Sequence, residues 1–129
     1  MPEGTEAVIL ELGANDALRG INPKVTSAAL NDIIKHLNER GIAVLLCGMR
    51  APRNMGTDYA KAFDAIFPTL AKSHDLLFYD FFLDGVATDP KLNQDDGMHP
   101  NAAGVEVIVK RLLPKVEELI ARARARRRS

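Results

Sequence analysis

The chain has 129 residues, of which 47% are apolar and 26% charged, and its 17 basic residues balance its 17 acidic ones. This length and apolar fraction are typical of one globular domain and exclude a wholly disordered chain. No apolar run approaches the roughly 18–20 residues that span a bilayer, and Met1–Ala7 lacks the pattern of a signal peptide. Cys47 is the only cysteine, which excludes an intrachain disulfide and a cysteine-based zinc site.

The first half of the chain predicts an alternation of buried strands and amphipathic helices. Short, continuously apolar runs predict strands at Ala7–Leu12 and Ile42–Cys47. Between them, Asn22 is expected to cap a helix that has Pro23 at its first position and ends at Gly41.

The second half continues the same pattern. Thr57 is expected to cap one helix, whose inner face is formed by Tyr59, Phe63, Ile66, Phe67 and Leu70. Leu76–Tyr79 predicts a third strand, followed by an irregular stretch over residues 81–100. Asn101 then caps a last helix, which Pro114 should kink or interrupt.

Five of the 17 basic residues are arginines between positions 122 and 128. Without them, 12 basic residues face 17 acidic ones, so the remainder of the chain carries a net charge of −5. A nucleic-acid surface spreads basic residues over a folded face and interleaves aromatic ones, which this tail lacks. We therefore expect a domain over residues 1–121, followed by a solvated, frayed Arg-rich tail over 122–129, and no nucleic-acid partner.

Three apolar strands that alternate with helices predict an α/β fold, a parallel sheet covered on both faces with right-handed crossovers. In such sheets the ligand site lies beyond the carboxyl ends of the strands, where the loops at residues 13–16, 48–56 and 95–101 should converge. Asn15 offers an amide donor there, and Asp96 lies three residues before His99, a spacing at which a carboxylate can orient an imidazole base. Base, orienter and oxyanion donor together suit acyl transfer. Taken singly, such residues are more often turn formers, a helix cap and a surface histidine.

Two motifs are similar to blocks of the SGNH (GDSL-type) hydrolase family. Gly13–Asp16, with the sequence G-A-N-D, resembles the G-x-N-D block, and Asp96–Asn101, with the sequence D-G-M-H-P-N, resembles the D-x-x-H-P block. The spacing between them and the Arg50–Gly56 loop resemble the bacterial acyl-CoA thioesterase, lysophospholipase and arylesterase branch. The resemblance extends from about Ala7 to about Leu119.

The resemblance implies a three-layer, flavodoxin-like parallel sheet of strand order 2-1-3-4-5. It also implies hydrolysis of carboxylic esters or thioesters by Ser-His-Asp chemistry, without cofactor or metal. His99 would be the general base, Asp96 its orienter, with Asp95 as the alternative, and Asn15 an oxyanion-hole donor. The loop after the second strand would bind substrate through Arg50, Pro52, Asn54 and Met55.

The chain departs from the family at its start. The blocks that carry the nucleophilic serine and the oxyanion-hole glycine are missing, and with them the first two strands of the family's sheet. The only serines are Ser27, Ser73 and Ser129, none of which follows an apolar strand. We therefore expect the isolated chain to be inactive as a serine esterase. His36 and His74 match no motif and are expected to be solvated.

The missing strands also predict a partner. The edge of Ala7–Leu12 would be uncovered, and we expect either a second copy of the chain or a complementing N-terminal fragment to cover it. Two alternatives remain open: a degenerate relative that binds ligands or partners without hydrolysis, and an unrelated flavodoxin-like binding domain. The chain as written is expected to be cytoplasmic, or periplasmic if a signal peptide precedes the missing part.

Overall fold

The computed structural model describes residues 4–13, 16–17, 19–51, 53–83, 86–87, 89–95 and 100–128. Its elements are, in chain order, β1 (Ala7–Leu10), α2 (Pro23–Glu39), β2 (Ala43–Cys47), the 3-10 turn η1 (Arg53–Met55), α3 (Thr57–Asp64), α4 (Ile66–Ser73), β3 (Leu77–Tyr79) and α5 (Ala102–Arg128). The strands form one parallel sheet of order β1-β2-β3. The predicted α/β class is confirmed.

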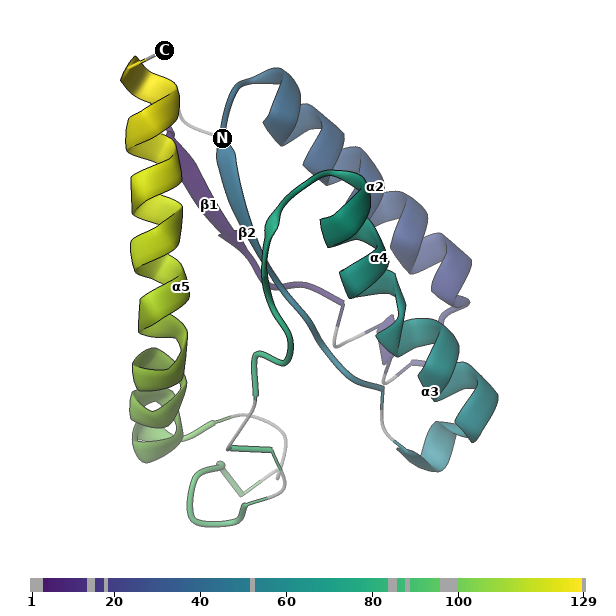
Figure 1. Ribbon diagram of the computed structural model, residues 1–129. Coiled ribbons are helices and arrows are strands. Elements are labelled where there is room, and N and C mark those ends of the chain that lie inside the picture. Colours follow the sequence, from purple (N-terminus) through teal and green to yellow (C-terminus); the bar gives the residue numbers. More distant parts are fainter. Residues whose placement is uncertain are drawn as a thin grey trace.

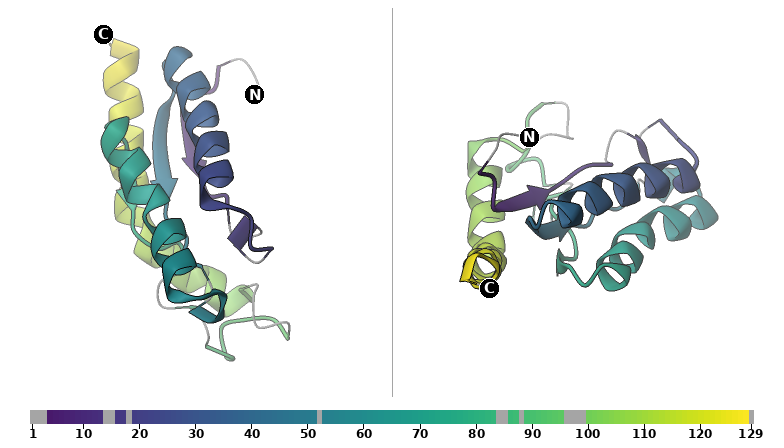
Figure 2. Two further views of the ribbon diagram at one scale, coloured as in Figure 1. Left: turned by 90° about the vertical axis from the view of Figure 1, so that its right-hand side faces the viewer. Right: turned by 90° about the horizontal axis from the view of Figure 1, so that it is seen from above.

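Helices cover the sheet on both faces, so that the structure has three layers (Figures 1 and 2). The helices α2, α3 and α4 lie on one face, and α5 lies alone on the other. Because successive side chains of a strand point to opposite faces, β2 contributes to both cores: Val44 and Leu46 face α2 and α4, whereas Leu45 faces α5. The β2 strand is buried throughout, as its continuous apolar sequence predicts.

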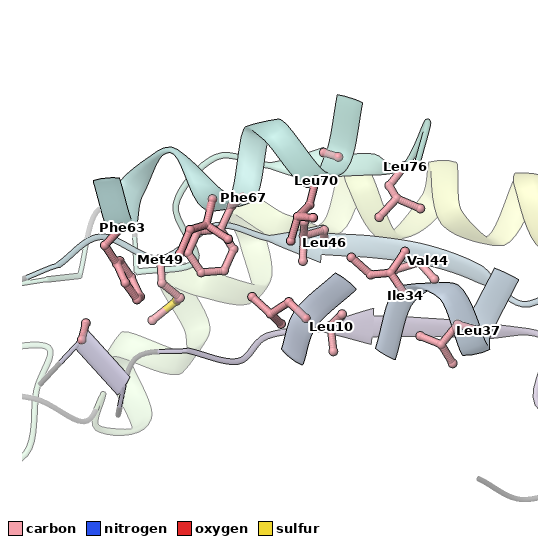
Figure 3. Close-up of a cluster of buried hydrophobic side chains, with 14 of the residues drawn as sticks. Leu10, Ile34, Leu37, Val44, Leu46, Met49, Phe63, Phe67, Leu70 and Leu76 are labelled. Carbon is pink, nitrogen blue, oxygen red and sulfur yellow. The ribbon is translucent and has the colours of Figure 1, made fainter. Parts of the chain in front are cut away.

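The larger core lies between the sheet and the three helices on its first face (Figure 3). Two fully buried aromatic rings, those of Phe63 in α3 and Phe67 in α4, meet edge to face with their centroids 5.6 Å apart. Leucines and isoleucines from α2 complete this layer: Leu30, Ile34 and Leu37. The smaller core on the α5 face contains Leu112, Leu119 and Ala123.

Two helix ends that the sequence predicts are confirmed. The Asn22 side chain accepts a hydrogen bond from the Lys24 backbone N–H, at 3.0 Å, and Pro23 is the first residue of α2. The Asn101 side chain caps α5 by accepting from the Gly104 N–H at 2.9 Å.

The single helix predicted after residue 56 was wrong. It is divided at Ala65 into α3 and α4. Pro68 explains the break, because it has no N–H to donate to the carbonyl of Asp64 and its ring crowds that carbonyl. Thr57 is also not the cap of α3: the cap position is Gly56, in the left-handed conformation at φ 97° that favours glycine.

The C-terminal helix is continuous and longer than expected. α5 continues from Ala102 to Arg128 as one helix with Pro114 inside it, so the expected interruption there is not found. The expected fraying of the Arg-rich end is not found either. Ala123 is buried against the sheet, and the guanidinium of Arg122 donates to the carbonyl of Asp75 at 2.9 Å, which ties this end of α5 to the start of β3.

Candidate functional site

Three loops follow the carboxyl ends of the strands and gather at one edge of the sheet, below the strands in Figure 1. They follow β1, β2 and β3 and end at α2, α3 and α5, and their described residues are 11–13, 16–17, 19–22, 48–51, 53–56, 80–83, 86–87, 89–95 and 100–101. The start of α5 lies at the same edge. This is the edge where the sequence predicts a catalytic site, and the residues assigned to it belong to these three loops.

The loop after β1 is fixed on both sides of Asn15, which itself lies outside the described residues. On one side, Gly13 has φ 110°, and a Cβ atom there would come within 3.2 Å of the Phe67 ring. On the other side, Asp16 accepts a hydrogen bond at 2.8 Å from the hydroxyl of Thr26, which is 2% exposed. The loop is therefore anchored to both α2 and α4.

A third anchor comes from α3. The Tyr59 hydroxyl donates to the carbonyl of Ile21 at 2.6 Å and also lies 3.4 Å from the carbonyl of Asp16. The Ile21 N–H in turn donates to the carbonyl of Asp16 at 3.0 Å. These bonds close the loop after Asn15, so that Asp16, the residue next to the predicted oxyanion donor, is held by α2 and α3.

The loop that carries Asp96 and His99 is closed at its base, although both residues lie outside the described ranges. Asn93 and Pro100 form an isolated antiparallel bridge across this base. The Asn93 amide is 8% exposed and donates to two carbonyls, that of Val86 at 2.7 Å and that of Asp89 at 2.8 Å. The two ends of this loop are therefore held next to each other at the Asn93–Pro100 bridge.

The first turn of α5 completes this base. The Asn101 N–H donates to the carbonyl of Leu92 at 2.9 Å, and its side-chain amide donates to that of Lys91 at 2.9 Å. Gly104 is necessary here, because a Cβ atom at this position would lie 2.1 Å from the Leu92 carbonyl oxygen. The alternative orienter, Asp95, is exposed in the same loop.

The loop after β2 is tied to its neighbours rather than open. The Arg50 guanidinium donates to the Asp80 carboxylate at 3.1 Å and lies 4.6 Å from the centre of the Phe81 ring. The Ala51 N–H donates to the carboxylate of Asp64 at 2.8 Å. Arg50 thus joins the loops after β2 and β3, a role that the sequence did not indicate.

The other residues predicted to bind substrate are placed in part. Asn54 is exposed and Met55 is half-buried in η1, and Pro52 lies outside the described residues. The Met55 methyl group approaches the loop after β1, because a Cβ atom at Gly20 would lie 3.0 Å from it. Met55 therefore brings the first two loops together.

Cys47 is not suited to act as a nucleophile. Its side chain is completely buried at the end of β2. Burial, and after it the charge of Glu11, raise the pKa of the Cys47 thiol to about 12, so that the reactive thiolate is not formed near neutral pH. Burial also raises the pKa of the Glu11 carboxyl above its usual value.

His36, His74 and Ser73 lie apart from the loops that bear Asn15 and His99. His36 is exposed, as predicted. His74 is not simply solvated: its Nε2 atom lies 2.7 Å from the Asn31 side-chain oxygen, in a half-buried contact between α4 and α2. Ser73 ends α4 at the opposite edge of the sheet, whereas Ser27 follows Thr26 in α2.

Two kinds of supporting residue were missed from the sequence. Thr26 carried a readable signal, since it lies four residues before Leu30 and is the one polar residue of α2 that the structure describes as buried. Asn93 carried none, because its acceptors belong to an irregular stretch without periodicity.

The described ranges contain no cluster of three or more His, Cys, Asp or Glu residues that could hold a metal ion. Within the same ranges, none of the helices combines the length and apolarity that crossing a bilayer requires.

Curated relatives match most of this chain, and each match covers about half of the relative's own length. Thioesterase 1/protease 1/lysophospholipase L1 of Escherichia coli K12 is 37% identical over 113 residues, which are 88% of this chain and 54% of the relative. An arylesterase of Vibrio mimicus is 40% identical over 95 residues, 74% of this chain and 48% of the relative. The chain therefore spans about half the length of the curated relatives it matches.

Solved structures share the fold. The crystal structure of TesA superposes with a TM-score of 0.85 at 32% identity, covering 91% of this chain and 65% of the other. AlinE4, an SGNH-hydrolase family esterase, superposes with a TM-score of 0.72 at 43% identity and covers 92% of this chain and 62% of its own. The GDSL-like Lipase/Acylhydrolase family matches residues 2–107. The chain thus belongs to this family of SGNH hydrolases, as its G-A-N-D and D-G-M-H-P motifs indicated.

Proposed function

We propose that this chain is the part of a serine carboxylic-ester or thioester hydrolase that carries the general base. His99 acts as the base, Asp96 orients it and Asn15 donates to the oxyanion. The nucleophilic serine and the second oxyanion donor come from a segment outside these 129 residues. The observation that carries the proposal is that the two loops bearing these residues lie at one edge of the sheet, each anchored on both sides.

The reaction proceeds in two steps. The serine oxygen attacks the acyl carbonyl carbon while His99 takes the serine proton, and Asn15 stabilises the negative charge that develops on the carbonyl oxygen. The C–O or C–S bond then breaks, and His99 returns the proton to the leaving alcohol or thiol. In the second step a water molecule, activated by His99, attacks the carbonyl carbon of the acyl-enzyme. The acid is released, and His99 returns the proton to the serine.

We assign substrate contacts to the loop after β2. Asn54 and Met55 lie in its 3-10 turn, and Pro52 precedes them. Arg50 is held by Asp80 and Phe81, so it shapes the wall between two loops and would meet substrate only with its remaining N–H groups. Ester and thioester hydrolases among the relatives support this substrate class.

The decisive experiment joins the chain to the missing part of the fold and follows hydrolysis of a p-nitrophenyl ester. His99→Ala should lower kcat by several orders of magnitude, as in other serine hydrolases that lose their base. His36→Ala, a matched change at an exposed histidine of α2, should leave kcat unchanged. Equal activity of the two variants would contradict the assignment of His99.

A second function, binding without hydrolysis, is favoured by the positions of the candidate nucleophiles within this chain. Among the described residues Cys47 is buried and protonated, and Ser73 lies at the far edge of the sheet. We therefore expect the purified 129-residue chain to show no esterase activity and no labelling by a fluorophosphonate. Labelling of Ser27, with turnover lost on Ser27→Ala, would reveal a nucleophile within the chain itself.

A further inference from the structure

β2 and β3 remain hydrogen-bonded just beyond their last residues, and there the β3 side carries one extra residue. The Gly48 N–H donates to the carbonyl of Tyr79 at 2.7 Å, and the Gly48 carbonyl accepts from the Phe82 N–H at 2.9 Å. In a regular parallel ladder these two partners are two residues apart, because the bonds are evenly spaced. Here they are three apart, so Asp80 and Phe81 form a β-bulge opposite Gly48.

The bulge depends on glycine at position 48. It brings the carbonyl of Asp80 so close to the Gly48 Cα that a Cβ atom at this position would collide with the carbonyl oxygen. Any other residue would push the two chain segments apart. β-bulges are frequent next to active sites, where they change the direction of side chains, and this one lies at the carboxyl edge of the sheet.

Both side chains of the bulge contact the same residue, Arg50. The Arg50 guanidinium donates to the Asp80 carboxylate at 3.1 Å and lies 4.6 Å from the centre of the Phe81 ring. In a regular strand, neighbouring side chains point to opposite faces, so they could not meet one partner in this way. Phe81 belongs to neither of the two buried cores that the described residues form. Its contact with Arg50 is therefore not a by-product of core packing.

Arg50 begins the loop after β2, and the next residue holds this loop from the other side. Ala51 is 3% exposed, and its N–H donates to the carboxylate of Asp64 at the end of α3, at 2.8 Å. Two consecutive residues are thus bound to different elements, Arg50 to the start of the loop after β3 and Ala51 to α3. Opening of the loop after β2 requires both attachments to break.

We propose that Asp80 and Phe81 are positioning residues. Through Arg50 they form a latch that holds the loop after β2, which we assign to substrate, against the loop that carries His99. The latch fixes the substrate wall before substrate arrives, so that binding does not have to order it. Its effect on catalysis rests on the proposed function, but the latch itself does not.

Hydrogen exchange of the Ala51 amide in the 129-residue chain measures opening of the loop. Asp80→Ala should speed this exchange about 1.5- to 5-fold, the range for an exposed ion pair. Arg50→Met keeps the apolar stem and removes both contacts, so it should speed exchange about 3- to 25-fold. The difference between Asp80→Ala and the unchanged chain should shrink in 1 M NaCl, because salt screens exposed charges.

Two variants serve as controls. Asp80→Glu keeps the charge on a side chain that is 79% exposed and has room for one more methylene, so it should preserve slow exchange. Asp32→Ala removes an exposed carboxylate from α2 and should leave Ala51 unaffected. The amide of Leu46, a buried residue of β2, reports on the stability of the whole fold and should not change in Asp80→Ala.

The completed enzyme adds a kinetic readout. With a p-nitrophenyl ester, Asp80→Ala should raise KM about 2- to 5-fold and leave kcat unchanged, because the latch orders the binding wall and meets no charge that develops in the reaction. Asp80→Glu should restore the original KM. A residue that only stabilised the fold would not produce this division between KM and kcat.

Each result decides the question. Faster Ala51 exchange in Asp80→Ala and Arg50→Met, but not in Asp80→Glu or Asp32→Ala, supports the latch. Unchanged exchange in Arg50→Met, or an equal change at Leu46, overturns it. Faster exchange with an unchanged KM in an active enzyme overturns the positioning role. A completed enzyme that is inactive without any substitution counts against the proposed function alone, and the exchange result then decides whether the latch exists.

Discussion

Asn93→Ala should loosen the base of the loop that carries His99. The change removes two hydrogen bonds, to the carbonyls of Val86 at 2.7 Å and Asp89 at 2.8 Å, and leaves both acceptors without the buried amide. At about 0.5–1.5 kcal/mol for each bond, the expected cost is about 1–3 kcal/mol. A loss of that size makes local opening about 5- to 140-fold more frequent.

Native-state hydrogen exchange measures this opening directly. The N–H groups of Asn101 and Gly104, which are bonded to Leu92 and to the Asn101 side chain, should exchange faster by that factor. Asn38→Ala is the control, since Asn38 is exposed near the end of α2 and alanine is only about 0.7 kcal/mol better in a helix. Unchanged exchange at both amides in Asn93→Ala would refute the view that Asn93 fixes this loop.

Three further predictions concern single residues. In the completed enzyme, Asn15→Ala should lower kcat by about 10²–10³ with little change in KM, because an oxyanion donor acts as charge develops; a change confined to KM would contradict that role. Glu11→Gln should raise the free energy of unfolding at neutral pH and lose this advantage in acid: burial raises the pKa of Glu11 in the folded state, so folding is weakened as pH rises through that pKa. Urea titrations across pH would show it, and a gain independent of pH would not fit. Gly104→Ala should lower Tm, although glycine to alanine within a helix ordinarily adds about 1 kcal/mol, because the new Cβ meets the Leu92 carbonyl oxygen; a raised Tm would show that α5 can shift away.

The order of strands and helices could be predicted because apolar runs and caps are local signals. β2 reads as continuously apolar and is buried on both faces, and Asn22 and Asn101 cap their helices as their positions indicate. The break between α3 and α4 was missed because apolar periodicity continues across it, whereas the cause is a missing N–H at Pro68.

The residue types of the candidate site could be predicted from the sequence, but the contacts that hold their loops could not. The G-A-N-D and D-G-M-H-P motifs led to the family that the comparisons show, yet Asn15, Asp96 and His99 keep their catalytic roles as predictions. The groups that hold their loops are distant in sequence: Tyr59 lies 38 residues from Ile21, the residue whose carbonyl it binds. Such contacts cannot be predicted from sequence spacing, because they form only when the folded sheet brings its loops together.

The strands of this chain are neighbours in the sheet in the same order in which they occur in the sequence. Each of the two strand pairings that the structure describes is therefore closed by a single crossover, so neither must wait for a more distant strand. Loop-closure entropy is then spent in small steps, which favours rapid folding during synthesis. A segment whose strands are neighbours in sequence order can be joined to another protein through a single connection. Under the proposed function, such a segment would serve as one half of a split reporter whose signal is ester cleavage.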